Sequence, residues 1–235
     1  MGKLKYFTSV FTGVLECLTG AAIIFGWSNL RLVLQKENFF YDSSGCQGVD
    51  GADYENCITE AKNAQEASFN KVFTVASLLL GCSVLPNGLI FDKFGTLATR
   101  IIASALFLTG CLVLAIAMAE QSFLVYIAMI CICVGGILFF VTNLQTGNLF
   151  PKHRSSIIAL ISGSVDSSSA VCLFVKLAYD GGCSLKSIFL VYSSLTAYQL
   201  FRFVFFLNFF IRNVACLIKF TTRINVVETY LNILS

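Results

Sequence analysis

The chain alternates between long apolar runs and short connections that carry the charges. Six runs contain few charges or none, at 7–30, 72–91, 101–119, 121–151, 155–178 and 187–211. A membrane-spanning helix needs roughly 20 consecutive apolar residues, whereas the strands of a membrane barrel alternate apolar and polar positions. Because these runs are continuous, the pattern predicts an all-α membrane protein with six transmembrane helices.

The composition supports a membrane protein and excludes several other classes. Of the 235 residues, 57% are hydrophobic and 12% are charged, whereas about a quarter of the residues in a soluble domain are charged. The net charge of +3 does not indicate a nucleic-acid binder. No catalytic triad, HExxH, P-loop or GxGxxG pattern occurs, so we expect no enzyme activity, no cofactor and no metal site.

Basic residues gather in four regions between or beside the apolar runs. They are Lys3, Lys5, Lys93, Arg100, Lys152, Arg154, Arg212, Lys219 and Arg223. With six spans, all four regions fall on one side of the membrane, and the positive-inside rule makes that side cytoplasmic. We therefore expect a six-helix bundle over 1–211 and a cytoplasmic tail over 212–235, with both termini in the cytoplasm.

The largest polar segment, 35–70, is rich in Gly, Asp and Asn and is predicted to be an exoplasmic loop. It contains Cys46 and Cys57. Exoplasmic compartments are oxidising, so these cysteines are predicted to form a disulfide; two free thiols in a mobile loop are the alternative. Most other cysteines lie within the apolar runs, where they are interpreted as small packing residues.

The connection after the second run reads GLIFDKFG over 88–95, and Arg100 follows it. This resembles the G-x-x-x-D-[RK]-x-G signature of the major facilitator superfamily, in the same loop between spans two and three. Gly88 would allow close helix approach, and Gly95 would permit a tight turn. A basic residue usually follows the second glycine of this signature, but here Thr96 stands at that position. Arg100 is therefore expected to be the charge partner of Asp92.

Two further stretches narrow this resemblance to one family. LECLTGAAIIFGWSNL (15–30) and TNLQTGNLFPKHRSSIIALISGSVDSSSAVCLFVKLAYDGG (142–182) resemble solute carrier family 43. The second stretch resembles its nucleobase-transporting branch more than its amino-acid-transporting members. The similarity fades after Tyr198, where the family continues into a long loop and six further spans.

The resemblance implies facilitative transport of purine nucleobases, such as adenine, guanine and hypoxanthine, across the plasma membrane without an ion gradient. Transport in this fold requires two six-helix bundles that rock about a central site. One bundle suggests a truncated or alternative form, which would need a second transporter half or another copy. The alternatives are a non-transporting membrane subunit that regulates a full-length carrier, and transport of large neutral amino acids.

Five polar residues within or beside the predicted spans are candidates for substrate binding. Glu16 lies midway along the first run, where a carboxylate faces either a cavity or a hydrogen-bonding helix. Asn143 and Gln145 can donate and accept hydrogen bonds, as the edge of a base requires, or they can form an interior gate. Asp166 and Ser167 form a polar patch in the fifth run, although serine also permits close helix packing.

Overall fold

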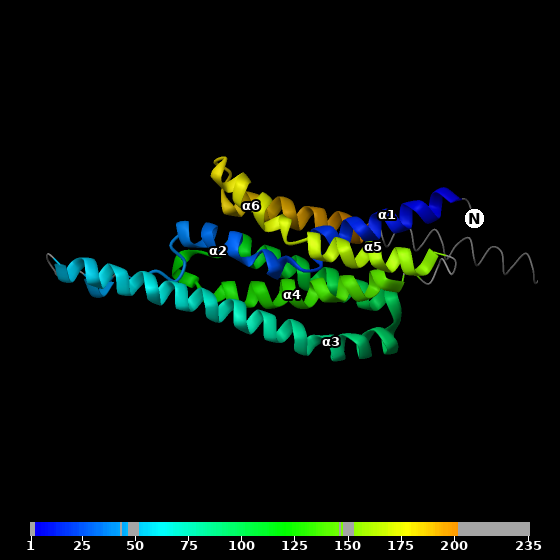
Figure 1. Cartoon of the computed structure of the whole chain (residues 1–235), viewed down its shortest axis with the longest axis horizontal. Helices are drawn as coiled ribbons and strands as arrows, with labels where there is room; N and C mark the ends of the chain where they lie inside the picture. Colours follow the sequence, from blue (N-terminus) through cyan, green and yellow to red (C-terminus); the bar gives the residue numbers. More distant parts are fainter. Residues whose placement is uncertain (1–2, 43, 47–51, 146, 148–152, 202–235) are drawn as a thin grey trace, which may run out of the picture. The chain divides into compact units, whose positions relative to one another are not determined.

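The computed structural model describes residues 3–42, 44–46, 52–145, 147 and 153–201, and these ranges contain helices and no strand (Figure 1). The elements are α1 (Lys3–Gly20), the 3-10 helix η1 (Ile23–Gly26), α2 (Trp27–Lys36), η2 (Ser44–Cys46), α3 (Ala52–Ile116), η3 (Ala119–Gln121), α4 (Phe123–Leu144), α5 (Arg154–Ser167) and α6 (Ala170–Asp180). Residues 185–201 are also helical. Residues 1–196 form one compact unit and 197–235 a second; the predicted tail lies outside the described residues.

Three helical stretches are long and apolar enough to cross a membrane. They are Asp53–Ile116, Phe123–Leu144 and Arg154–Asp180, and a fourth span results if Val10–Gly20 and Ile23–Lys36, bent by 45°, count as one. The prediction of an all-helical membrane protein is confirmed. In the described part of the chain, length and composition identify three or four spans, and the count of six stays a prediction.

Helix α3 is interrupted at Gly95, where φ is 75° and ψ is 177°. A straight helix of its 65 residues would extend about 98 Å, roughly three times the thickness of the hydrocarbon core. The backbone at Gly95 lies in a region that only glycine adopts readily. The break therefore separates two helices, and the apolar runs at 72–91 and 101–116 fall on opposite sides of it.

The main apolar core lies between α3 and α4, with α2 and α6 packed against it. Its fully buried side chains include Phe69, Phe107, Met129 and Leu138. Glycine allows α3 and α4 to approach closely, because a Cβ atom at Gly135 would lie 2.9 Å from the carbonyl oxygen of Ala103. The core thus fixes the positions of α3 and α4, which carry part of the site described below.

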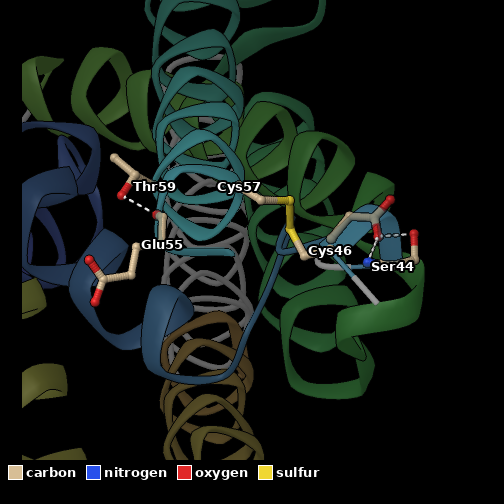
Figure 2. The surroundings of a disulfide bond; sticks show 6 residues. Ser44, Cys46, Glu55, Cys57 and Thr59 are labelled. Carbon is tan, nitrogen blue, oxygen red and sulfur yellow. Dashed lines mark hydrogen bonds between the residues drawn. A yellow bond between two sulfur atoms is a disulfide. The ribbon is translucent and has the colours of Figure 1, made fainter. Parts of the chain in front are cut away.

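The segment expected to be an exoplasmic loop is largely helical. Helix α3 already begins at Ala52, in a stretch rich in the helix-forming residues Ala, Glu, Gln and Lys. A disulfide joins Cys46 to Cys57, the pair anticipated from the sequence, and so fastens η2 to the second turn of α3 (Figure 2). The Gln65 amide donates to the carbonyl oxygen of Phe39 at 2.8 Å, which anchors this segment a second time.

The connection before the disulfide contains a local turn at Asp42. Its carboxylate accepts hydrogen bonds from the hydroxyl of Ser44 at 2.6 Å and from the backbone N–H of Ser44 at 2.9 Å. Both bonds lower the pKa of Asp42 below its usual value, and the bond from the hydroxyl has the larger effect. The turn directs the chain into η2, where Cys46 is held by the disulfide (Figure 2).

Candidate functional site

Three polar side chains from three different helices meet inside the bundle. Glu16 of α1 forms an ion pair with Arg100 of α3. Asn143 of α4 accepts a hydrogen bond from Arg100 Nη1 at 3.2 Å and donates one to Glu16 Oε2 at 3.2 Å. We call Glu16, Arg100 and Asn143 the polar triad.

The polar triad is almost completely removed from solvent. Glu16 is 8% exposed, Arg100 7% and Asn143 1%. Charged groups in such surroundings require both a counter-ion and hydrogen-bond partners, because the desolvation of an unpaired charge is very unfavourable. Asn143 supplies an acceptor to Arg100 and a donor to Glu16, and it also donates to Cys17 Sγ at 3.4 Å. The triad therefore ties α1, α3 and α4 together through compensated polar contacts.

The structure brings two of the five predicted substrate-binding residues, Glu16 and Asn143, into contact. The third partner is Arg100, which the sequence predicts to belong to the conformational motif as the charge partner of Asp92. The reason is positional: Arg100 lies in the helix after the Gly95 break, facing the bundle interior, whereas Asp92 lies before that break and is exposed. A carboxylate that is buried without a counter-ion is far more unfavourable than an exposed one without a counter-ion, so pairing of Arg100 with the buried Glu16 is favoured.

The other predicted site residues lie at the bundle surface or at a helix end. Gln145 is the C-terminal cap residue of α4 and is partly exposed. Asp166 and Ser167 are both exposed on the last turn of α5. The Ser167 hydroxyl donates to the carbonyl oxygen of Gly163 at 3.0 Å, which is a bond within its own helix.

The motif residues before the Gly95 break are also accessible. Gly88 is partly exposed, and a Cβ atom added to it would meet nothing within 4 Å among the described residues. Its predicted role in close helix approach therefore stays a prediction. The turn at Gly95 is reinforced by Thr99, whose hydroxyl donates to the Gly95 carbonyl oxygen at 2.8 Å.

The sequence predicts one continuous span at 7–30 and another at 155–178. The first segment is bent by 45°, whereas the second remains one candidate span, Arg154–Asp180, with a local turn between α5 and α6. The first chain segment changes from α1 to η1 and α2 over residues 20–27, and the second changes from α5 to α6 at Ser168 and Ser169. The small residues at 20–22 and the three consecutive serines at 167–169 were the available signals. Neither is specific, because small residues are also common in unbroken membrane helices.

The bend in the first segment contacts the turn between α5 and α6. The backbone N–H of Ala22 donates to the hydroxyl oxygen of Ser168 at 3.0 Å, and the Cys172 thiol donates to the carbonyl oxygen of Ile23 at 3.5 Å. A Cβ atom on Gly26 would clash with the carbonyl oxygen of Ser169 and lie 2.7 Å from Cβ of Cys172. Backbone groups freed at the bend are thus satisfied by side chains of Ser168 and Cys172, as the membrane interior requires.

The arrangement provides polar groups that can recognise a solute. Among the described residues, no cluster of three His, Cys, Asp or Glu side chains is placed to bind a metal ion. The carboxylate, guanidinium and amide of the polar triad can bind the polar edge of a solute if they become accessible. Asp166 and Ser167 provide a second, already exposed set of polar groups.

Comparison with known proteins finds several relatives. The chain is 40% identical over 195 residues to Equilibrative nucleobase transporter 1 of Bos taurus, covering 83% of this chain and 39% of that protein. It is 32% identical over 190 residues to Large neutral amino acids transporter small subunit 3 of Homo sapiens, and the match covers 78% of this chain and 34% of that protein. It is 30% identical over 179 residues to Protein FMP42 of Saccharomyces cerevisiae, and the match covers 75% of this chain and 34% of that protein.

The chain therefore spans between 34% and 39% of the length of these three relatives. No family model matches the chain, and no solved structure matches it. The relatives confirm the resemblance inferred from residues 15–30 and 142–182. The chain belongs to solute carrier family 43 and matches the N-terminal part of its transporters.

Proposed function

We propose that the chain forms part of a facilitative carrier for purine nucleobases such as adenine, guanine and hypoxanthine, driven by neither a sodium nor a proton gradient. The observation that carries this proposal is the 40% identity over 83% of the chain to a nucleobase transporter. The amino-acid transporter relatives are less similar, at 32% and 33%.

The proposed architecture is the N-terminal six-helix bundle of a major facilitator superfamily fold, over 1–211, in the plasma membrane. The break at Gly95 supports it, because the break divides α3 into segments that match two of the predicted spans. The Cys46–Cys57 disulfide supports an exoplasmic position for the 35–70 segment. The basic residues of the opposite connections favour a cytoplasmic position for both termini, by the positive-inside rule.

The exposed polar patch of α5 supports a position beside a solute pathway. Asp166 lies near the middle of the candidate span Arg154–Asp180, whose most apolar part is far less covered by the rest of the chain than that of α3 or α4. A carboxylate facing lipid at that depth is unfavourable by about 2.5–3.5 kcal/mol. We therefore propose that Asp166 and Ser167 face an aqueous cavity shared with a second transporter half or another copy of the chain.

A purine offers ring N–H donors together with carbonyl and ring-nitrogen acceptors along one edge. In the proposal, Asp166 and Ser167 bind this edge first, and Glu16, Asn143 and Gln145 bind it when the polar triad opens. The same groups could bind the ammonium of an amino acid. The 32% identity to a large neutral amino acid transporter makes this the second candidate function.

Uptake into proteoliposomes tests the proposal. We expect the purified chain, alone or reconstituted with a full-length family member, to increase uptake of labelled adenine without a sodium or pH gradient. Asp166→Asn should reduce this uptake several-fold, and Glu60→Gln, a matched change at an exposed carboxylate of the exoplasmic part of α3, should not.

The outcomes separate the alternatives. Uptake of labelled leucine but not of adenine would assign amino-acid transport. No uptake by the chain alone, combined with altered uptake when a full-length carrier is present, would identify a regulatory subunit. If uptake equals that of empty liposomes under both conditions, the proposed transport role is wrong.

A further inference from the structure

Two buried N–H groups of α2 have no hydrogen-bond acceptor among the described residues. They are Nε1 of Trp27 and Nε of Arg31. Trp27 is 6% exposed, and Arg31 is half-buried. A buried donor without an acceptor is unfavourable, and native structures contain few of them. Both groups are therefore available to an acceptor that comes from outside the described part of the chain.

The two donors belong to one face of α2, and this face is directed toward α3. Arg31 follows Trp27 by four residues of the same helix, which places the two side chains one turn apart on one side. The Trp27 ring packs edge-on against that of Phe69 in α3, with 6.2 Å between the ring centroids. The donors therefore lie along the contact between α2 and α3.

Gln65 supplies a polar group from α3 at about the same level. It lies four residues before Phe69, which corresponds to about 6 Å along the helix, and its amide donates to the carbonyl oxygen of Phe39 beyond the end of α2. The two helices thus run in opposite directions, and Gln65 is level with the turn of α2 that carries Arg31. Its amide is 98% buried in the sense that only 2% of the residue is exposed, and its oxygen remains an acceptor.

Arg31 has no counter-ion among the described residues. Two carboxylates at the same end of the bundle are already engaged, because Asp180 pairs with Lys36 at 2.6 Å and Glu37 accepts a hydrogen bond from Tyr179 at 2.8 Å. An arginine that only reaches the lipid headgroups keeps its guanidinium in the solvent, whereas Nε of Arg31 is shielded from solvent. The guanidinium therefore suits a polar ligand that binds against α2 and α3.

The donors and the acceptor match one edge of a 6-oxopurine, such as hypoxanthine or guanine. This edge presents the acceptors O6 and N7 side by side, with the N1–H donor next to O6. A planar guanidinium donates two parallel hydrogen bonds to such a pair of acceptors. Adenine carries an amino donor in place of O6, so that a donor would face a donor.

We propose that Trp27, Arg31 and Gln65 form a recognition site that selects 6-oxopurines over adenine. The Arg31 guanidinium donates to O6 and N7, the Trp27 indole supplies a further donor, and the Gln65 oxygen accepts from N1–H. None of the three belongs to the substrate-binding residues proposed above. The site rests on the proposed function, because it assumes that the solute is a purine.

Trp27 is the only tryptophan of the 235 residues, so its fluorescence reports on this site. The full chain in nanodiscs is titrated with hypoxanthine, adenine or leucine, and Trp27 is excited at the red edge of its absorption, where purines absorb little. We expect hypoxanthine to change the emission at a concentration at least about tenfold lower than adenine, as a lost bidentate contact implies. Leucine should have no effect.

Two variants of Arg31 test the role of its guanidinium. Arg31→Lys keeps the charge but loses the planar pair of donors, and it should weaken hypoxanthine binding about tenfold while it changes adenine binding less than about twofold. Arg31→Met should weaken hypoxanthine binding at least as much. The matched control is Lys176→Met, which removes another half-buried cation, on α6, and should leave the binding of both bases unchanged.

The proposal is overturned if adenine binds as tightly as hypoxanthine, or if Arg31→Lys binds hypoxanthine as the native chain does. A response to leucine alone would assign the guanidinium to a carboxylate ligand and would also overturn it, as would no response to any of the three compounds. If both Arg31 variants melt at lower temperature than the native chain, the comparison of the two bases on the native chain decides.

The binding measurement does not require transport, so the two proposals can fail separately. A response of Trp27 to hypoxanthine without purine uptake would contradict the carrier function and leave this site intact. Purine uptake without any response of Trp27 would contradict only this site.

Discussion

The carboxylate of Glu16 is paired with the guanidinium of Arg100 inside the bundle, and both side chains are less than 10% exposed. The pair connects α1 to the helix that follows the Gly95 break. Asn143 completes it from α4. One buried ion pair and its hydrogen bonds therefore hold together three segments that lie far apart in the sequence.

Arg100→Met should lower the free energy of unfolding by about 3–5 kcal/mol, because it leaves a buried carboxylate without a counter-ion. The double variant Glu16→Met, Arg100→Met should recover most of this loss, since two apolar side chains can replace a buried ion pair with little net change. Denaturant unfolding of the detergent-solubilised chain measures both. Equal losses in the single and double variants would contradict the pairing.

Gly26→Ala should destabilise the chain by about 1–3 kcal/mol, because the added methyl group would clash with the Ser169 carbonyl at the turn between α5 and α6. The matched control is Gly163→Ala in α5, where a Cβ atom meets nothing within 4 Å. Alanine should stabilise that helical position slightly. Similar melting temperatures for the two variants would argue against the close approach at Gly26.

Gly95→Ala should lower stability by about 1–3 kcal/mol, since alanine is strained at a φ of 75° combined with a ψ of 177°. Gly81→Ala is the control: Gly81 is a helical position in α3 where an added Cβ atom meets nothing within 4 Å. Thermal unfolding followed by circular dichroism distinguishes the two. A neutral Gly95→Ala variant would mean that the chain turns elsewhere.

Cys46→Ser should reduce stability by about 2–3 kcal/mol, as expected for a disulfide that closes a short loop. Removal of the exposed free thiol with Cys82→Ser should have little effect. Alkylation with and without prior reduction, followed by mass spectrometry, checks the bond itself. If Cys46 and Cys57 are both alkylated before reduction, the disulfide does not form in the protein as isolated.

Much of the fold follows from local sequence. Apolar runs with few charges or none predict membrane helices because burial of charges in hydrocarbon is unfavourable, and α4 and α5–α6 coincide with two of these runs. The turn at Gly95 and the pairing of Cys46 with Cys57 were likewise anticipated. In these cases a short stretch, or the chemistry of the compartment, is sufficient to identify the feature.

The candidate site was anticipated less completely. Glu16 and Asn143 were selected because polar side chains are rare in membrane helices, but their contact with each other and with Arg100 was not foreseen. Arg100 has an acidic residue nearby in sequence, Asp92, and a second one, Glu16, on a distant helix. Which of these two carboxylates Arg100 binds depends on how deeply each is buried, and a single sequence does not reveal this.

The sequence by itself determined the class of the protein, the positions of its apolar helices and its family, because these depend on residue composition and order alone. Only the tertiary structure decided that the bend after Gly20 lies against the turn at Ser168 and that Arg100 pairs with Glu16. The physical reason is that backbone groups freed in the membrane interior, and charges buried there, must find partners within the protein. Which partners they find depends on how the helices pack.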